Sequence, residues 1–510
     1  MKNKLKLKQF VKKPVVGLMV IVVFSKILGF FREIVMSYYY GASYVTDTFA
    51  LANSSANIFF GWVAVLAVLH TPFFQEIKEQ KGTENAQKFT NQLILLTVFI
   101  GGICLFVLTI FSNNAIGLVA KGFSAEMVEI TSIFFRWAIM GLLITTINQI
   151  WISELNCKKA FISANATNLI LSLIQVIIIF TSGYLNNIML LKVSQPLAVF
   201  IQLILLIILV RKNGRTFKLG TPFVGEFKRL FILITPVFFV TLMDQINTLI
   251  DRMFASGLTE GSISALNYAH MVKQLFFFVF ATAIVTILFP KLSESISQNN
   301  LEEFKNITIK GIRYMIILFV PITLFVMTFS NAIVSIIYER GAFDSTAAKM
   351  TSESLFMYGS ALLPLAIREI LLKGFLAMMN TRVNLFIGIL STIINIALNF
   401  LLVSHFQHMG LALSTSLTAY LTVPILFFMM RKKIFIRNIR NEILLMVKTL
   451  FSALVGILII RLIYNTTQII FSSSTIWSFT GIIIGSIMGV LCYILLLKIM
   501  KVDEMKLIIR

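Results

Sequence analysis

The chain has 510 residues, of which 58% are hydrophobic and 13% are charged, against roughly 25% charged residues in soluble domains. Its formal charge is +22, because 44 Lys and Arg stand against 22 Asp and Glu. Apolar runs of about 20 residues, the length that a helix needs to cross a bilayer, recur from Pro14 almost to the end. The composition therefore excludes a soluble enzyme and predicts an all-α, polytopic membrane protein.

The apolar runs predict about fourteen transmembrane helices, separated by connectors too short to hold a folded domain. The predicted spans are 15–38, 48–72, 92–112, 131–153, 161–182, 190–210, 230–252, 266–290, 314–338, 352–378, 384–404, 408–430, 445–464 and 475–498.

A faint internal repeat divides these spans. Residues 14–32 parallel residues 236–252 in the same sense, and a same-sense repeat is typical of transporters whose halves are related by an axis along the membrane normal. We therefore expect one six-helix lobe at 1–229 and a second at 230–440. The last two helices would follow as an appendage at 441–510.

The distribution of Lys and Arg over alternate connectors predicts the orientation. One set of connectors, together with both termini, holds 32 of the 44 basic residues, whereas the opposite set holds only four. Positively charged loops stay on the cytoplasmic side, so both termini are expected to be cytoplasmic.

Eight basic residues remain within or at the edges of the predicted spans. An ionised side chain at mid-bilayer costs about 2.5–3.5 kcal/mol on insertion scales, so such residues normally face a polar interior. Several of them together predict a cavity for an anion. The eight residues are Lys26, Arg32, Arg136, Lys192, Lys273, Arg368, Lys373 and Arg461.

These eight residues do not carry equal weight. Arg32 lies deep in an apolar segment, in one helix with Ser25, Lys26 and Glu33, and we interpret it as lining the cavity; the alternative is a structural ion pair with Glu33 or Asp47.

Lys273 and Arg368 fit either interpretation, as residues that line the cavity or as structural residues. For Arg368, the structural alternative is that Glu369 neutralises its charge. The other four residues lie closer to helix ends or in the appended pair, where a long side chain can reach the head groups.

A second set of polar residues suits a cation. Asp251 lies two turns from Asp244 on one helix face, and Asn395 and Asn399 are four residues apart on another helix, followed by Thr415 on the next. Carboxylate, amide and hydroxyl oxygens are ligands for a hard cation. The alternative is that the asparagines join helices by hydrogen bonds.

Phosphate-binding loops, zinc ligand sets and nucleophile triads are absent from the sequence, so we expect a transporter and not an enzyme. We expect no cofactor and no nucleic acid partner.

Several motifs resemble the MurJ/MviN lipid II flippases of the MOP exporter superfamily. The opening signature is FSKILGFFRE at 24–33, followed by YGA at 40–42 and TDTF at 46–49. Further matches are FAS at 254–256, GSISALNYA at 261–269, LFPKLS at 288–293, YERGAFD at 338–344 and GLALSTS at 410–416. The resemblance implies fourteen helices in a bacterial cytoplasmic membrane, with two six-helix lobes and a trailing pair.

The resemblance also implies a function. A cationic cavity would take the pyrophosphate and sugar head of a polyprenyl-linked glycan from the inner leaflet and present it outside by alternating access. Lipid II for peptidoglycan synthesis is the expected cargo. A groove reaching helices 13 and 14 would hold the lipid tail, Na+ or H+ would be the coupling ion, and the partners would be the bilayer and cell-wall synthesis proteins.

The resemblance assigns residues to these roles. Ser25, Arg32 and Asp47 match cavity positions of the family, Lys26 stands where Arg is usual, and Glu33 stands where Asp is usual. With Lys273 and Arg368, they form the predicted substrate-binding set. The predicted cation-binding set is Asp251, Asn395, Asn399 and Thr415.

The chain departs from the family pattern at two cavity arginines. Residues 57–62 carry no charge where an Arg pair is usual, and Tyr268-Ala269 continues with His270, with Lys273 further on. Lys lacks the bidentate fork of Arg, so the lipid II prediction has alternatives. These are a flippase for capsule, exopolysaccharide or teichoic-acid precursors, a MATE-like drug or cation antiporter, and an inactive scaffold in a cell-wall complex.

Overall fold

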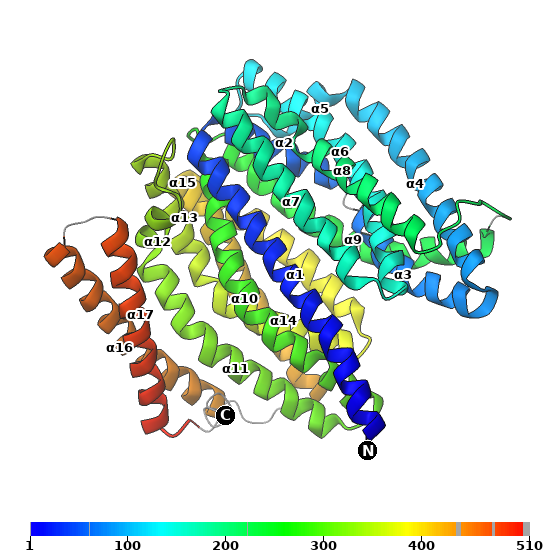
Figure 1. The fold of residues 1–510 in the computed structure, drawn as a ribbon. Coiled ribbons are helices and arrows are strands. Elements are labelled where there is room, and N and C mark those ends of the chain that lie inside the picture. Colours follow the sequence, from blue (N-terminus) through cyan, green and yellow to red (C-terminus); the bar gives the residue numbers. More distant parts are fainter. Residues whose placement is uncertain (1, 61, 222, 435–439, 472–474, 503–510) are drawn as a thin grey trace. The chain divides into compact units, whose positions relative to one another are not determined.

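The computed structural model describes residues 2–60, 62–221, 223–434, 440–471 and 475–502, which form helices joined by short connectors (Figure 1). Within this part, eight helices are long and apolar enough to cross a membrane, and the number becomes ten if each of two bent pairs is one span. Every predicted span falls on one helix or on two consecutive helices. The all-helical membrane class is therefore confirmed, and the number of fourteen stays a prediction.

The chain divides into two compact units, of which the first is Met1–Ile263. Its helices are α1 (Lys2–Tyr40), α2 (Tyr44–Phe60), α3 (Trp62–Lys81), α4 (Thr83–Ile110), α5 (Ser112–Val119), α6 (Ala125–Cys157), α7 (Phe161–Tyr184), η1 (Ile188–Leu190), α8 (Leu191–Lys212) and α9 (Val224–Ser256).

Long helices packed side by side build the first unit. Helix α1 lies along α7, while α6 packs against α2, α3 and α8 (Figure 1). One apolar core of this unit includes Phe74, Phe89 and Ile150, each fully buried. Its members come from α3, α4, α6 and α9 and from Phe223 just before α9, so burial of apolar side chains holds these helices together.

The second unit is Ser264–Arg510. Its helices are α10 (Ser262–Ser297), α11 (Leu301–Thr328), α12 (Ser330–Tyr338), α13 (Ser345–Ser360), α14 (Leu362–Ala377), α15 (Thr381–Ile434), α16 (Arg440–Phe471) and α17 (Thr475–Ile499). Helix α11 packs on α13, α14 and α16, and α16 pairs with α17 along its length (Figure 1). Helix α15 changes direction at Gln407, whose φ of 48° and ψ of −129° are not helical.

The division into units comes one helix later than the expected lobe boundary at residue 229. Helix α9 packs on α2 and α3, which places it in the first unit. The lobes at 1–229 and 230–440, with the pair at 441–510, were derived from a repeat and stay a prediction.

Two of the sequence motifs form an aromatic cluster in the second unit. Tyr268, from the GSISALNYA motif, lies with its ring centroid 5.1 Å from that of Tyr338 and 5.5 Å from that of Phe343, both from the YERGAFD motif. The latter motif turns at Gly341, with a φ of 66° that favours glycine. It ends at Asp344, whose Oδ1 caps α13 by accepting from the Ala347 N–H at 2.8 Å.

A buried ion pair fixes the connector between α8 and α9. The Arg215 guanidinium donates to the Glu154 carboxylate of α6 and to Asn91 Oδ1 of α4, and the Arg215 and Glu154 side chains are both fully buried. Lys158 Nζ also lies 3.0 Å from Glu154 Oε1. Trp151 packs on the guanidinium, with 5.4 Å between Cζ and the ring centroid.

The same connector is hydrogen-bonded to one face of α4. Gln87 Oε1 accepts from the Thr216 N–H at 3.0 Å, and Asn91 Nδ2 donates to the carbonyls of Thr216 and Lys218. Gln92 Nε2 donates to the carbonyls of Leu219 and Thr221, and its Oε1 accepts from the Phe223 N–H. Gln87 and Asn91 are four residues apart and lie on one face of α4, and Gln92 follows directly after Asn91.

Exposed ion pairs join the adjacent part of α9 to α3. Lys81 Nζ lies 2.6 Å from Glu226 Oε1, and Arg229 Nη1 lies 2.7 Å from Glu76 Oε1. The hydrogen bond from Lys81 lowers the pKa of the Glu226 carboxyl. Surface pairs of this kind contribute about 0–1 kcal/mol, so the buried pair is the stronger anchor of the connector.

We predict that Glu154→Gln destabilises the protein by about 3–5 kcal/mol, because it leaves the Arg215 charge buried without its carboxylate. Thermal unfolding in detergent measures this as a fall in Tm. The matched control is Glu226→Gln at the exposed pair, with an expected change of at most about 1 kcal/mol. The double variant Glu154→Leu/Arg215→Met should recover part of the loss, and equal Tm values for Glu154→Gln and Glu226→Gln would contradict this account.

Candidate functional site

Arg32 is held in a three-residue cluster between α1 and α7. Its Nη2 lies 2.5 Å from Glu33 Oε1, and its Nη1 donates to Gln175 Oε1 of α7 at 3.0 Å. The Arg32 side chain is 32% exposed, whereas Glu33 and Gln175 are buried. Of the two pairs considered from sequence, the structure forms Arg32 with Glu33. The guanidinium is fixed on two sides and still reaches the surface of the first unit.

The other predicted residues of α1 differ in their surroundings. Ser25 is half-buried, and its Oγ donates to the Ile21 carbonyl at 2.8 Å, a bond within the helix. Lys26 is exposed. The segment thus presents Lys26 and part of Arg32, while Ser25 is bonded to its own backbone.

Asp47 anchors two turns of the first unit to each other. It is 3% exposed, and its Oδ2 accepts from the Gly261 N–H at 2.8 Å. Gly261 has a φ of 84°, and a Cβ there would lie 2.5 Å from the Ala42 carbonyl oxygen. Three motifs therefore meet here, the YGA turn, the TDTF helix start and the glycine before α10. The Asp47 carboxylate therefore holds the backbone of the turn at Gly261.

Lys273 and Arg368 lie in the second unit. Lys273 is 5% exposed, and its Nζ lies 4.6 Å from the centroid of the Tyr358 ring on α13. Arg368 is half-buried on α14. Glu369, which could neutralise Arg368, has its Oε1 3.6 Å from Lys373 Nζ. The structure thus gives Lys273 an aromatic neighbour that the sequence did not indicate.

The predicted cation-binding residues of α15 form one hydrogen-bonded group. Asn399 Nδ2 donates to Asn395 Oδ1 at 3.1 Å, and Ser414 Oγ donates to Asn399 Oδ1. Thr415 Oγ1 and Ser414 Oγ accept from Asn395 Nδ2 at 3.5 and 3.4 Å. These bonds cross the bend of α15, as expected for asparagines that join helix segments. Asp251 is half-buried in the first unit, and the cation role of all four predicted residues stays a prediction.

Two other cations of the embedded set contact residues near helix ends. Arg136 Nε donates to Ser112 Oγ at 2.7 Å, at the start of α5. Lys192, at the start of α8, has its Nζ 5.7 Å from the ring centroid of Trp137. Both contacts fit the interpretation that these side chains lie near the membrane boundary.

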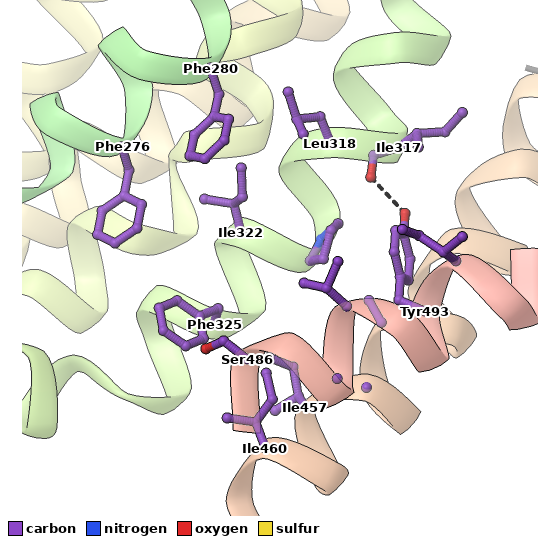
Figure 2. Close-up of a pocket in the computed structure, with 16 residues that line it drawn as sticks. Phe276, Phe280, Ile317, Leu318, Ile322, Phe325, Ile457, Ile460, Ser486 and Tyr493 are labelled. Carbon is purple, nitrogen blue, oxygen red and sulfur yellow. Dashed lines mark hydrogen bonds between the residues drawn. The ribbon is translucent and has the colours of Figure 1, made fainter. Parts of the chain in front are cut away.

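An apolar cavity of about 430 Å³ lies in the second unit. Figure 2 shows Phe276 and Phe280 of α10 on one side, with residues of α11, α16 and α17 around the rest. At one end, the Tyr493 hydroxyl donates to the Ile317 carbonyl at 2.6 Å, so this polar atom of the lining has a partner (Figure 2). The other labelled lining residues are Leu318, Ile322, Phe325, Ile457, Ile460 and Ser486.

Gln175 and Tyr358 are the site residues that sequence reasoning missed. Both are uncharged, so counting embedded charges did not select them. Gln175 is 8% exposed in the structure. The sequence carries a signal for it, because it is the only amide side chain in the apolar run at 169–180. Tyr358 gave no such signal, because an aromatic residue in an apolar helix is ordinary.

The chain matches the model of the family described as lipid II flippase MurJ over residues 36–497. A relative from Rhizobium tropici, described as a probable lipid II flippase MurJ, is 27% identical over 480 residues, covering 90% of this chain and 88% of the relative.

Solved structures show the same fold. A lipid II flippase MurJ in an inward closed conformation superposes with a TM-score of 0.81 at 22% identity, covering 97% of this chain and 100% of that chain. An inward-facing multidrug resistance MATE transporter of the MOP superfamily superposes with a TM-score of 0.71 at 12% identity, covering 82% of this chain and 98% of that chain. The expected MOP-type fold is thereby confirmed.

The family match extends over most of the chain and over both compact units. Together with the long apolar helices, it makes the chain a multi-pass protein of the bacterial inner membrane. The chain belongs to the lipid II flippase MurJ family.

Proposed function

We propose that this protein is a flippase that moves lipid II, the polyprenyl-pyrophosphate-linked precursor of peptidoglycan, from the inner to the outer leaflet by alternating access. The observation that carries the proposal is the family match over residues 36–497. The relative from Rhizobium tropici is described by the same activity. The fold is that of transporters, and the proposal assigns the chain a transport role in place of a catalytic one.

The pyrophosphate head requires fixed positive charge inside the membrane. Arg32 supplies it, because Glu33 and Gln175 hold its guanidinium while about a third of the side chain stays exposed. A planar guanidinium can bind phosphate oxygens with two donors at once. Lys26, exposed on the same helix, adds a second charge. In the second unit, Lys273 and Arg368 are the proposed cationic residues. Asp47 is proposed to act indirectly, by holding the backbone at Gly261.

The lipid tail requires an apolar path. The cavity between α10, α11, α16 and α17 has the lining that a polyprenyl segment needs, and its volume of about 430 Å³ suits part of such a chain. Because α16 and α17 line this cavity, they are the proposed tail-binding helices (Figure 2). The proposal thus places the polar head and the apolar tail on chemically different surfaces.

The remaining features of the proposed cycle are orientation and coupling. Both termini face the cytoplasm in this proposal, supported by the excess of Lys and Arg in one set of connectors. Membrane potential or a bound Na+ or H+ drives the cycle, and Asp251, Asn395, Asn399 and Thr415 are the proposed ion ligands. Cell-wall synthesis proteins are the proposed partners, because lipid II is their substrate.

We predict that the protein rescues bacterial cells depleted of their own lipid II flippase. The measurement is colony formation, together with the fraction of lipid II that an external reagent can reach. Failure of a well-expressed, inserted protein would remove lipid II as the cargo. Rescue restricted to strains that lack a capsule or teichoic-acid flippase would assign one of those precursors instead.

We further predict that Arg32→Ala lowers transport at least tenfold at unchanged expression, because a charged hydrogen bond contributes about 1.5–3 kcal/mol. Arg32→Lys should keep part of the activity, since the point charge remains without the fork. Gln175→Leu should cause a smaller loss, because one of the groups that orient Arg32 is removed.

The matched control is Arg136→Ala, which removes an embedded arginine that lies against Ser112. Its transport should stay within about twofold of wild type, as expected for an arginine near the membrane boundary. Equal losses in Arg32→Ala and Arg136→Ala would contradict a specific role for Arg32.

A further inference from the structure

The ring of Tyr358 contacts two side chains of α10 in the second unit. The Lys273 ammonium lies over its face, 4.6 Å from the centroid, and the His270 ring meets it edge to face, with centroids 5.8 Å apart at 84°. Tyr358 and Lys273 are 6% and 5% exposed. The Lys273 ammonium of α10 therefore lies against a buried aromatic ring of α13.

The spacing on α10 explains why one ring meets both side chains. His270 and Lys273 are three residues apart and therefore lie on one face of the helix. Gln274, one turn after His270, has its Nε2 3.1 Å from His270 Nε2. His270 therefore contacts both the amide of Gln274 and the Tyr358 ring.

An ammonium at the end of four methylene groups needs such a support. The Lys side chain is flexible and carries its charge as a point, so its position depends on what it packs against. The face of an aromatic ring attracts a cation most strongly when both groups are withdrawn from water. Burial of Tyr358 and Lys273 meets this condition.

We propose that Tyr358 is a positioning residue, which fixes the Lys273 ammonium where it can bind the anionic head group of a lipid-linked cargo. The anionic cargo in this inference rests on the proposed function, whereas the contact between the ring and the ammonium comes from the structure alone. Tyr358 acts through Lys273, and its hydroxyl plays no part in this role.

Transport kinetics test the proposal through the ring. Tyr358→Leu removes the aromatic face and should raise the apparent KM for lipid II about tenfold, the order of a desolvated cation–π contact, with kcat within about twofold of wild type. Tyr358→Phe keeps the face and should keep both constants within about twofold. Lys273→Met should raise KM as much as Tyr358→Leu.

The double variant Tyr358→Leu/Lys273→Met separates positioning from general damage. If Tyr358 acts through Lys273, the double variant has the KM of Lys273→Met alone. Multiplied effects of the two substitutions, or a Tyr358→Phe variant as impaired as Tyr358→Leu, would overturn the proposal.

Chemical labelling of Lys273 tests the contact without any cargo. An amine-specific reagent, with the extent of modification read by mass spectrometry, should label Lys273 at least about threefold faster in Tyr358→Leu than in wild type, because the ring covers the ammonium. Tyr358→Phe should not change the rate. The matched control is Tyr464→Leu, which removes a ring that packs on Phe329, and this variant should label as wild type.

The transport and labelling experiments test the cargo and the positioning of Lys273 separately. Ring-dependent labelling in a protein that does not transport lipid II would overturn the proposed cargo and support the positioning of Lys273. A labelling rate unchanged in Tyr358→Leu would overturn the positioning, whatever the protein transports.

Discussion

Every charge within a membrane-spanning helix must be held by other groups, because the bilayer interior does not solvate it. Arg32 meets this requirement with Glu33 and Gln175, and Lys273 lies on the Tyr358 ring. The two solutions differ in chemistry, since one uses hydrogen bonds and the other uses an aromatic face. Glu33 balances the charge of Arg32, whereas the Tyr358 ring lies against the ammonium of Lys273. In the proposed transport, the anionic head group needs the N–H donors of Arg32 and the ammonium of Lys273.

The motifs that resemble the family are largely structural anchors in this chain. Asp47 holds the turn before α10 through Gly261, and Tyr268, Tyr338 and Phe343 form one aromatic cluster. These contacts join segments far apart in the sequence. The motifs therefore serve the fold as well as the proposed site, because the opening signature at 24–33 also contains Lys26 and Arg32.

The helices were predictable because apolar runs of about 20 residues follow from the requirement to span a bilayer. The bend at Gln407 was also foreseen as a break between 384–404 and 408–430. The pairs that orient the charges were not predictable. Arg32 and Gln175 are 143 residues apart, and Arg215 and Asn91 are 124 residues apart. Such pairs arise from helix packing and leave no local pattern in a single sequence.

The central claim is that charge retained inside the membrane selects a pyrophosphate head group. The most direct measurement is transport by the purified protein in liposomes, comparing lipid II with the same glycan on a polyprenyl monophosphate. The account predicts that the pyrophosphate is transported at least about tenfold faster, because its second phosphate adds charge-assisted hydrogen bonds. Equal rates for the two lipids would contradict it.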